Sequence, residues 1–182
     1  MVRWLQDVVW VLAVALAFGL VFGLNELLFS GFGYATGVDW IFLPGGFRLL
    51  AVLLLAGKGA LGVALASALI ASFTMFPEDP VTGVGAGVMS GFAPWLGRYL
   101  SIGLLQVRED LSGLSPADLL KLSAVFALLS ASLHQLWYVS RGYSDDLLRG
   151  VGVMAVGDFL GALLVLYAAR WVLIGVARQG RR

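Results

Sequence analysis

Cysteine is absent from this 182-residue chain, and histidine occurs once, at His134. Without cysteine the chain has no disulfide, no thiolate metal site and no cysteine nucleophile. A single histidine also excludes a multi-histidine metal or haem site within the chain. Charge is scarce as well: 13% of residues are charged, against roughly 25% in ordinary soluble domains. The net charge of +1 gives no basis for nucleic-acid binding.

Apolar residues and glycine are abundant instead. Hydrophobic residues make up 60% of the chain, glycine contributes 24 residues and the mean hydropathy is +0.92. Such a chain belongs in lipid rather than water. We therefore predict a single all-α domain, a polytopic transmembrane helix bundle of about six spans. The predicted spans are approximately 8–29, 40–56, 60–76, 81–105, 118–139 and 147–176.

The second span is predicted to be broken. Pro44 lacks an amide donor and two glycines follow it, which disfavours a regular helix at this point. The apolar run 47–56 is too short to cross about 30 Å of hydrocarbon at about 1.5 Å per residue. We expect an irregular or re-entrant lead-in over 40–46 and a helix that starts near Gly46. A tight turn over 57–59 follows this helix.

Small residues recur every four positions in three spans. This spacing lets membrane helices approach closely. The three sets are Gly19 and Gly23; Ala60, Ala64, Ala68 and Ser72; and Gly83, Gly87 and Gly91.

Basic residues predict the orientation. With six spans, nine of the twelve basic residues lie on the side of the two termini: Arg3, Lys58, Arg98, Arg108, Lys121, Arg170, Arg178, Arg181 and Arg182. The other side holds Arg48, Arg141 and Arg149. The positive-inside rule then places both termini in the cytoplasm.

Six polar residues fall within the outer half of the predicted spans, where an unpaired charge is costly. They are Arg48, Asp158, Glu26, Asn25, His134 and Gln135. We expect them to form a polar pocket that opens toward the outside, with Arg48 paired to Glu26 or Asp158. Free backbone amides near Gly45 and Gly46 are candidates to hold an anionic group.

Four of these residues also have a purely structural interpretation, whereas Asp158, the deepest acid, favours a functional or pairing role over exposure. Arg48 with an acidic partner is as well explained by a structural ion pair as by a ligand site. Glu26 and Asn25 fit simple exposure at the interface, and His134 fits a satisfied structural histidine. Aromatic residues at the span ends are interpreted as an interfacial belt; they are Trp40, Trp137 and Tyr138.

The sequence carries no motif of a known catalytic site. The serines considered as nucleophiles have no base near them in sequence; they are Ser30, Ser72 and Ser90. We therefore expect neither an enzyme nor a bound cofactor or metal.

Three stretches resemble the MASE1 family of bacterial membrane sensor domains. They are the segment from Trp40 to Leu54, the turn from Gly57 to Gly62, and the segment from Val156 to Val165 with its Gly-Asp-x-x-Gly pattern. MASE1 domains have about eight spans and usually precede a histidine kinase or cyclic-dinucleotide enzyme domain. The resemblance implies a shortened, free-standing module, with Arg48 and Asp158 as the positions of interest.

Three functions remain open. The first is a MASE1-like sensor or accessory module in the bacterial inner membrane that binds a small ligand or a protein partner and acts through another chain. The second is the substrate-binding membrane subunit of a small-molecule transporter. The third is a structural or assembly subunit of a larger membrane complex.

Overall fold

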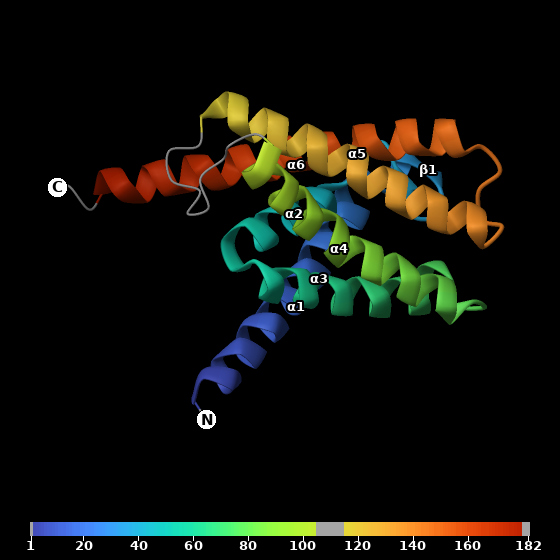
Figure 1. Cartoon of the computed structure of the whole chain (residues 1–182), viewed down its shortest axis with the longest axis horizontal. Helices are drawn as coiled ribbons and strands as arrows, with labels where there is room; N and C mark the ends of the chain where they lie inside the picture. The colour runs from blue at the N-terminus through green and yellow to red at the C-terminus, as the bar shows by residue number, and fades with distance from the viewer. Residues whose placement is uncertain (1, 105–114, 180–182) are drawn as a thin grey trace.

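The structure, a computed structural model, describes residues 2–104 and 115–179. Within these ranges the chain forms six α-helices, with one two-stranded hairpin between the first two (Figure 1). The elements are α1 (Val2–Phe29), η1 (Ser30–Phe32), β1 (Gly33–Ala35), β2 (Val38–Asp39), α2 (Leu43–Leu55), α3 (Gly57–Ile70), η2 (Ala71–Met75), α4 (Pro80–Leu104), α5 (Pro116–Ser140) and α6 (Leu147–Gln179).

The predicted fold class, an all-α helix bundle, is confirmed. Among the described residues, four helices are long and apolar enough to cross a membrane. The four candidate spans cover residues 3–32, 57–75, 116–140 and 147–172. The chain is therefore a membrane protein. α2, with 13 residues, is shorter, and at about 1.5 Å per residue it spans about 20 Å.

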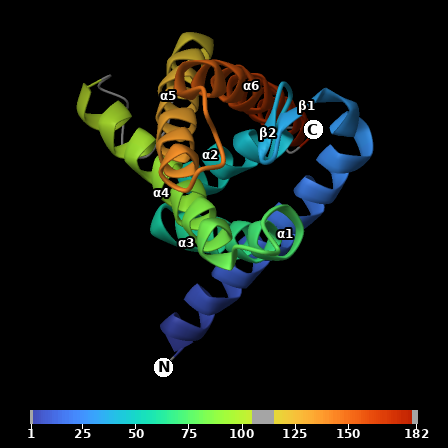
Figure 2. The same ribbon diagram turned by 90° about the vertical axis from the view of Figure 1, so that its right-hand side faces the viewer.

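α2 is the central helix of the bundle (Figure 2) and packs against all five other helices. Its start differs from the prediction: helical backbone begins at Leu43 rather than near Gly46. Pro44 lies in the first turn, where its missing amide hydrogen costs nothing. Asn25 of α1 supplies the cap, because its Oδ1 accepts a hydrogen bond from the Leu43 amide at 2.9 Å. Only the lead-in just before Leu43 is irregular.

The connection from α2 to α3 also differs from the predicted turn over 57–59. The turn centres on Ala56, whose φ of 49° is unusual for a residue with a side chain. The two glycines predicted to form the turn belong instead to the start of α3, where Gly59 packs against the Ala51 carbonyl. Lys58 forms an ion pair with Asp7 of α1.

α3 and α4 pack through the small residues that the sequence singles out. The helices are antiparallel, and Gly83, Gly87 and Gly91 face Ser72, Ala68 and Ala64 respectively. A side chain at any of the three glycines would collide with the neighbouring helix. The pair Gly19 and Gly23 differs, since a Cβ at either position would meet nothing within 4 Å.

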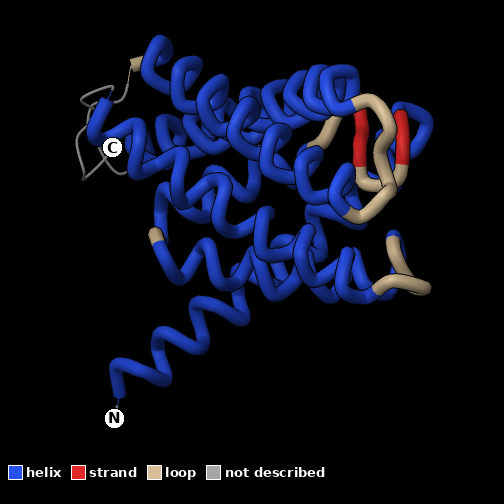
Figure 3. The backbone as a smooth tube through the Cα atoms, turned by 45° about the vertical axis from the view of Figure 1, so that its right-hand side comes forward, coloured by secondary structure: helices blue, strands red, loops and turns tan. Residues whose placement is uncertain are grey.

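One end of the molecule carries the hairpin and the loops that precede α4 and α6 (Figure 3). The opposite end carries the start of α1 and the end of α6 (Figure 1). Of the basic residues used to predict orientation, Arg108, Arg181 and Arg182 lie outside the described residues.

Candidate functional site

The predicted polar residues Arg48 and Asp158 meet inside the bundle. Arg48 lies in the second turn of α2 and is 4% exposed, while Asp158 of α6 is fully buried. Arg48 Nη1 and Asp158 Oδ1 are 4.0 Å apart, which is an ion pair too long for a direct hydrogen bond. Arg48 Nε and Nη1 and both carboxylate oxygens of Asp158 have no hydrogen-bond partner in the described part of the protein.

Glycines on α6 create the room for this pair. A Cβ at Gly157 would overlap the Asp39 carbonyl, and one at Gly161 would overlap the Phe42 carbonyl. The lead-in to α2 therefore lies directly on α6, and the Phe42 amide donates to the Gly157 carbonyl at 3.3 Å. Gly45 packs on the Asp158 side chain. The Gly45 amide already donates to the Phe42 carbonyl at 3.0 Å, and Gly45 and Gly46 both lie tightly against α6, so the anion site expected there has neither this free donor nor an open approach.

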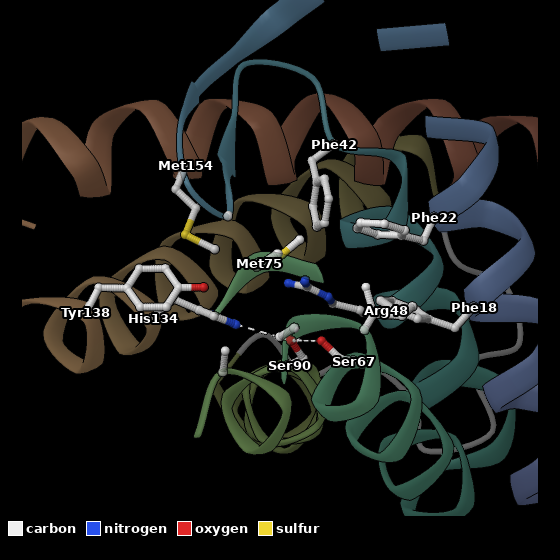
Figure 4. Close-up of a pocket in the computed structure, with 14 residues that line it drawn as sticks. Phe18, Phe22, Phe42, Arg48, Ser67, Met75, Ser90, His134, Tyr138 and Met154 are labelled. Atoms are coloured by element: carbon white, nitrogen blue, oxygen red, sulfur yellow. Dashed lines mark hydrogen bonds between the residues drawn. The ribbon is translucent and has the colours of Figure 1, made fainter. Parts of the chain in front are cut away.

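Aromatic rings surround the guanidinium of Arg48 (Figure 4). Its Cζ lies 4.9 Å from the Phe42 ring centroid and 5.9 Å from that of Phe18. The electron-rich ring faces attract a cation, and the attraction strengthens when water is excluded. The rings stabilise the charge without occupying its hydrogen-bond donors.

His134 belongs to a buried hydrogen-bonded chain that crosses three helices. Ser67 of α3 donates to Ser90 of α4 at 2.8 Å, and Ser90 Oγ lies 3.2 Å from His134 Nε2. His134 Nδ1 lies 2.8 Å from the Ser130 carbonyl. Because a carbonyl only accepts, Nδ1 carries the proton, and the neutral ring accepts from Ser90 at Nε2.

A cavity lies between this chain and Arg48. The space open to the centre of a water-sized sphere is about 20 Å³, above the roughly 10–15 Å³ that one water needs. Figure 4 shows the Arg48 side chain pointing toward Tyr138 and His134 across this space. The polar lining comes from Arg48, Ser67, Ser90, His134 and Tyr138, and the apolar lining includes Phe18, Phe22, Phe42, Met75 and Met154. Asp158 lies outside the lining.

Three of the six predicted residues neither line the cavity nor pair with Arg48. Asn25 is buried but caps α2, and Glu26 is exposed, so Asp158 is the acid that accompanies Arg48. Gln135 is buried against α6, where its Oε1 accepts from Ser144 at 3.0 Å. The structural interpretation of Asn25 as an exposed interfacial residue is wrong, because the start of α2 covers its side chain.

The structure adds Ser67, Ser90 and Tyr138 to the candidate site, where the sequence predicted none of them. Ser67 and Ser90 carry no sequence signal, since the base near Ser90 is 44 positions away. Tyr138 is 3% exposed and lines the cavity, so it is not a belt residue. Trp137 donates from Nε1 to the Thr82 carbonyl at 3.0 Å. Trp40 is 44% exposed, as a belt residue should be.

A second polar cluster lies outside the spans, where the loop before α4 meets the end of α5. Asp79 accepts hydrogen bonds from the Thr82 amide and hydroxyl at 3.2 and 2.6 Å. Arg141 Nη2 donates to both Asp79 oxygens at 3.1 and 2.9 Å. Hydrogen bonds from Thr82, then from Arg141, lower the pKa of Asp79 from 3.8 to about 2. This cluster fastens α4 to α5.

No family model, curated protein or solved structure matches this chain. Within the described ranges, no group of three or more histidine, aspartate or glutamate side chains is placed to hold a metal ion. The resemblance to MASE1 domains stays a prediction.

Proposed function

We propose that this protein is a ligand-binding membrane module of the sensor or accessory type, which acts through another protein chain. The observation that carries the proposal is Arg48: a guanidinium only 4% exposed, with two buried nitrogens free of protein partners, beside an internal cavity. A buried charge beside open space is energetically costly unless a bound ligand or a counter-charge compensates it. The predicted MASE1-like character agrees with this proposal.

A catalytic role for Ser90 and His134 is the main chemical alternative. A serine within hydrogen-bond reach of a histidine is the arrangement of a nucleophile and its base. Here, however, the serine hydroxyl also accepts from Ser67, and the cavity is far smaller than the several hundred Å³ of most substrate sites. We propose that the chain of hydrogen bonds positions the cavity wall. Labelling of Ser90 by a fluorophosphonate probe would contradict this.

The test is Arg48-dependent ligand binding. The protein purified in mild detergent is mixed with fractions of a bacterial extract, and its melting temperature is compared with that of Arg48→Gln. Arg149→Gln is the matched control, because Arg149 is exposed at the start of α6. We expect at least one small-molecule fraction to stabilise the wild type and the control but not Arg48→Gln. Equal responses from all three proteins would refute the proposal.

The two other functions are distinguished in cells. A transporter subunit predicts uptake that needs an ATPase partner, whereas an assembly subunit predicts stoichiometric co-purification with a large complex. A sensor or accessory module predicts a ligand-dependent output without uptake.

A further inference from the structure

We infer that the cavity beside Arg48 binds a small monovalent anion of one to a few heavy atoms. The inference rests on the proposed ligand-binding function and specifies the chemistry of the ligand.

The first argument is the balance of hydrogen-bond donors and acceptors around the cavity. Arg48 Nε and Nη1 are donors without protein partners. Tyr138, whose hydroxyl can donate a hydrogen bond, lines the same space. The serine and histidine groups are already engaged with one another. The buried cavity-lining atoms without a partner are therefore guanidinium donors, which an anion satisfies and a cation does not.

The second argument concerns charge. Asp158 lies 4.0 Å from the guanidinium but outside the cavity lining. It lowers the positive potential at the site without occupying the free donors. The charges of ionised Arg48 and Asp158 cancel, so a monovalent anion adds one uncompensated negative charge and a divalent anion adds two. The cost of burying that excess favours a monovalent anion over a divalent one.

The third argument is the cavity wall. Phenylalanine rings and the thioethers of Met75 and Met154 form part of it, so a ligand must give up part of its water on entry. The loss is smallest for weakly hydrated anions such as bromide or nitrate, and larger for small, strongly hydrated ones. The hairpin covers the cavity on one side, where Gly37, with φ of 73°, packs against the Tyr138 ring and Met75.

The experiment uses the full chain in a non-ionic detergent at constant ionic strength. Sodium gluconate, whose anion is too large, is replaced stepwise by sodium chloride, bromide, nitrate or formate, and the melting temperature is recorded. A ligand that binds only the folded state raises the melting temperature in a saturable way. We expect a rise of about 3–6 °C for at least one small anion.

Three variants separate a specific site from a general salt effect. Arg48→Gln should abolish the saturable rise, and Arg149→Gln should keep it. Asp158→Asn removes a competing negative charge, so it should lower the half-saturating concentration by about tenfold. Should Arg48→Gln fail to fold, Tyr138→Phe loses one donor while keeping the ring, and it should bind several-fold more weakly.

Two results would overturn the inference. One is a melting temperature that is the same in gluconate and in every small anion. The other is a non-saturating rise shared by the wild type and all variants, which would identify a salt effect. If an extract fraction still stabilises the wild type through Arg48, the proposed function stands and only the anionic identity of the ligand fails.

Discussion

The positive charge of Arg48 is buried inside the helix bundle, where a charge must be compensated by neighbouring groups. The ring faces of Phe18 and Phe42 and the carboxylate of Asp158 at 4.0 Å compensate it in part, and the Arg48 side chain also lines the cavity. No single partner satisfies it. This distribution separates the residue from an ordinary structural ion pair, in which the guanidinium and the carboxylate hydrogen-bond directly.

Removing one member of the pair should strongly destabilise the protein. Arg48→Ala strands the fully buried Asp158, and Asp158→Ala strands Arg48, so each should cost about 3–5 kcal/mol of unfolding free energy. The double variant Arg48→Met/Asp158→Leu should recover much of this loss, because no unpaired charge remains. Thermal unfolding in detergent measures all three. Unchanged melting temperatures for both single variants would show that the two charges do not depend on each other.

Asp79 gives a pH-dependent stability with a defined sign. Its pKa is lowered in the folded state to about 2 from 3.8, so the unfolded chain takes up the proton first as the pH falls. The stabilisation is complete above about pH 4 and is lost as the pH falls toward 2. The melting temperature of the wild type should drop across this window, and Asp79→Asn should lack that part of the drop.

Glu78→Gln is the control for this measurement, since Glu78 is the exposed neighbour in the same loop. It should retain the wild-type profile. Parallel profiles for the wild type and Asp79→Asn would show that the bond to Arg141 does not depend on the charge of Asp79.

At the scale of elements, glycine decides how closely helices pack. Gly157 and Gly161 let the lead-in to α2 lie against α6, and the glycines of α4 let it lie against the small residues of α3. Without an apolar driving force between helices in lipid, such close contacts supply much of the stabilisation. The spacing of four was visible in the sequence, but the partner of each set was not.

Two glycines of α6 form a matched pair for a test. A Cβ at Gly161 would overlap the Phe42 carbonyl, whereas a Cβ at Gly152 meets nothing within 4 Å. Gly161→Ala should therefore destabilise the protein by about 1–3 kcal/mol through overpacking. Gly152→Ala should be neutral or stabilising by up to about 1 kcal/mol, because alanine is the better helix former. Equal effects in thermal unfolding would argue against close packing at Gly161.

At the scale of the whole molecule, the hairpin lies at one end, and the start of α1 and the end of α6 lie at the other (Figure 1). The basic-residue count predicts that the end with the termini faces the cytoplasm. α1 exposes much of its apolar surface, including Trp10, Leu16 and Leu20. In a bilayer such a surface lies against lipid or a partner helix.

The absence of cysteine makes the orientation easy to test. Asp145 lies between α5 and α6 at the hairpin end, and Arg3 lies at the start of α1. Both side chains are exposed, so each can be replaced by cysteine in a separate variant. A membrane-impermeant maleimide should label Asp145→Cys in intact bacteria and Arg3→Cys only after permeabilisation. The reverse pattern would invert the predicted topology.

The sequence alone predicted the membrane class and the helical fold, because a chain with 13% charge and long apolar runs must pair its backbone groups internally in lipid, and a helix does so within each run. It also indicated Arg48 and Asp158, since charges within spans are rare. Tertiary structure decided their neighbours. Ser90 meets His134 across 44 positions, and Asn25 caps a helix 18 positions away. Such contacts depend on how helices rotate and cross, and that is settled by the summed packing of all six rather than by any local pattern.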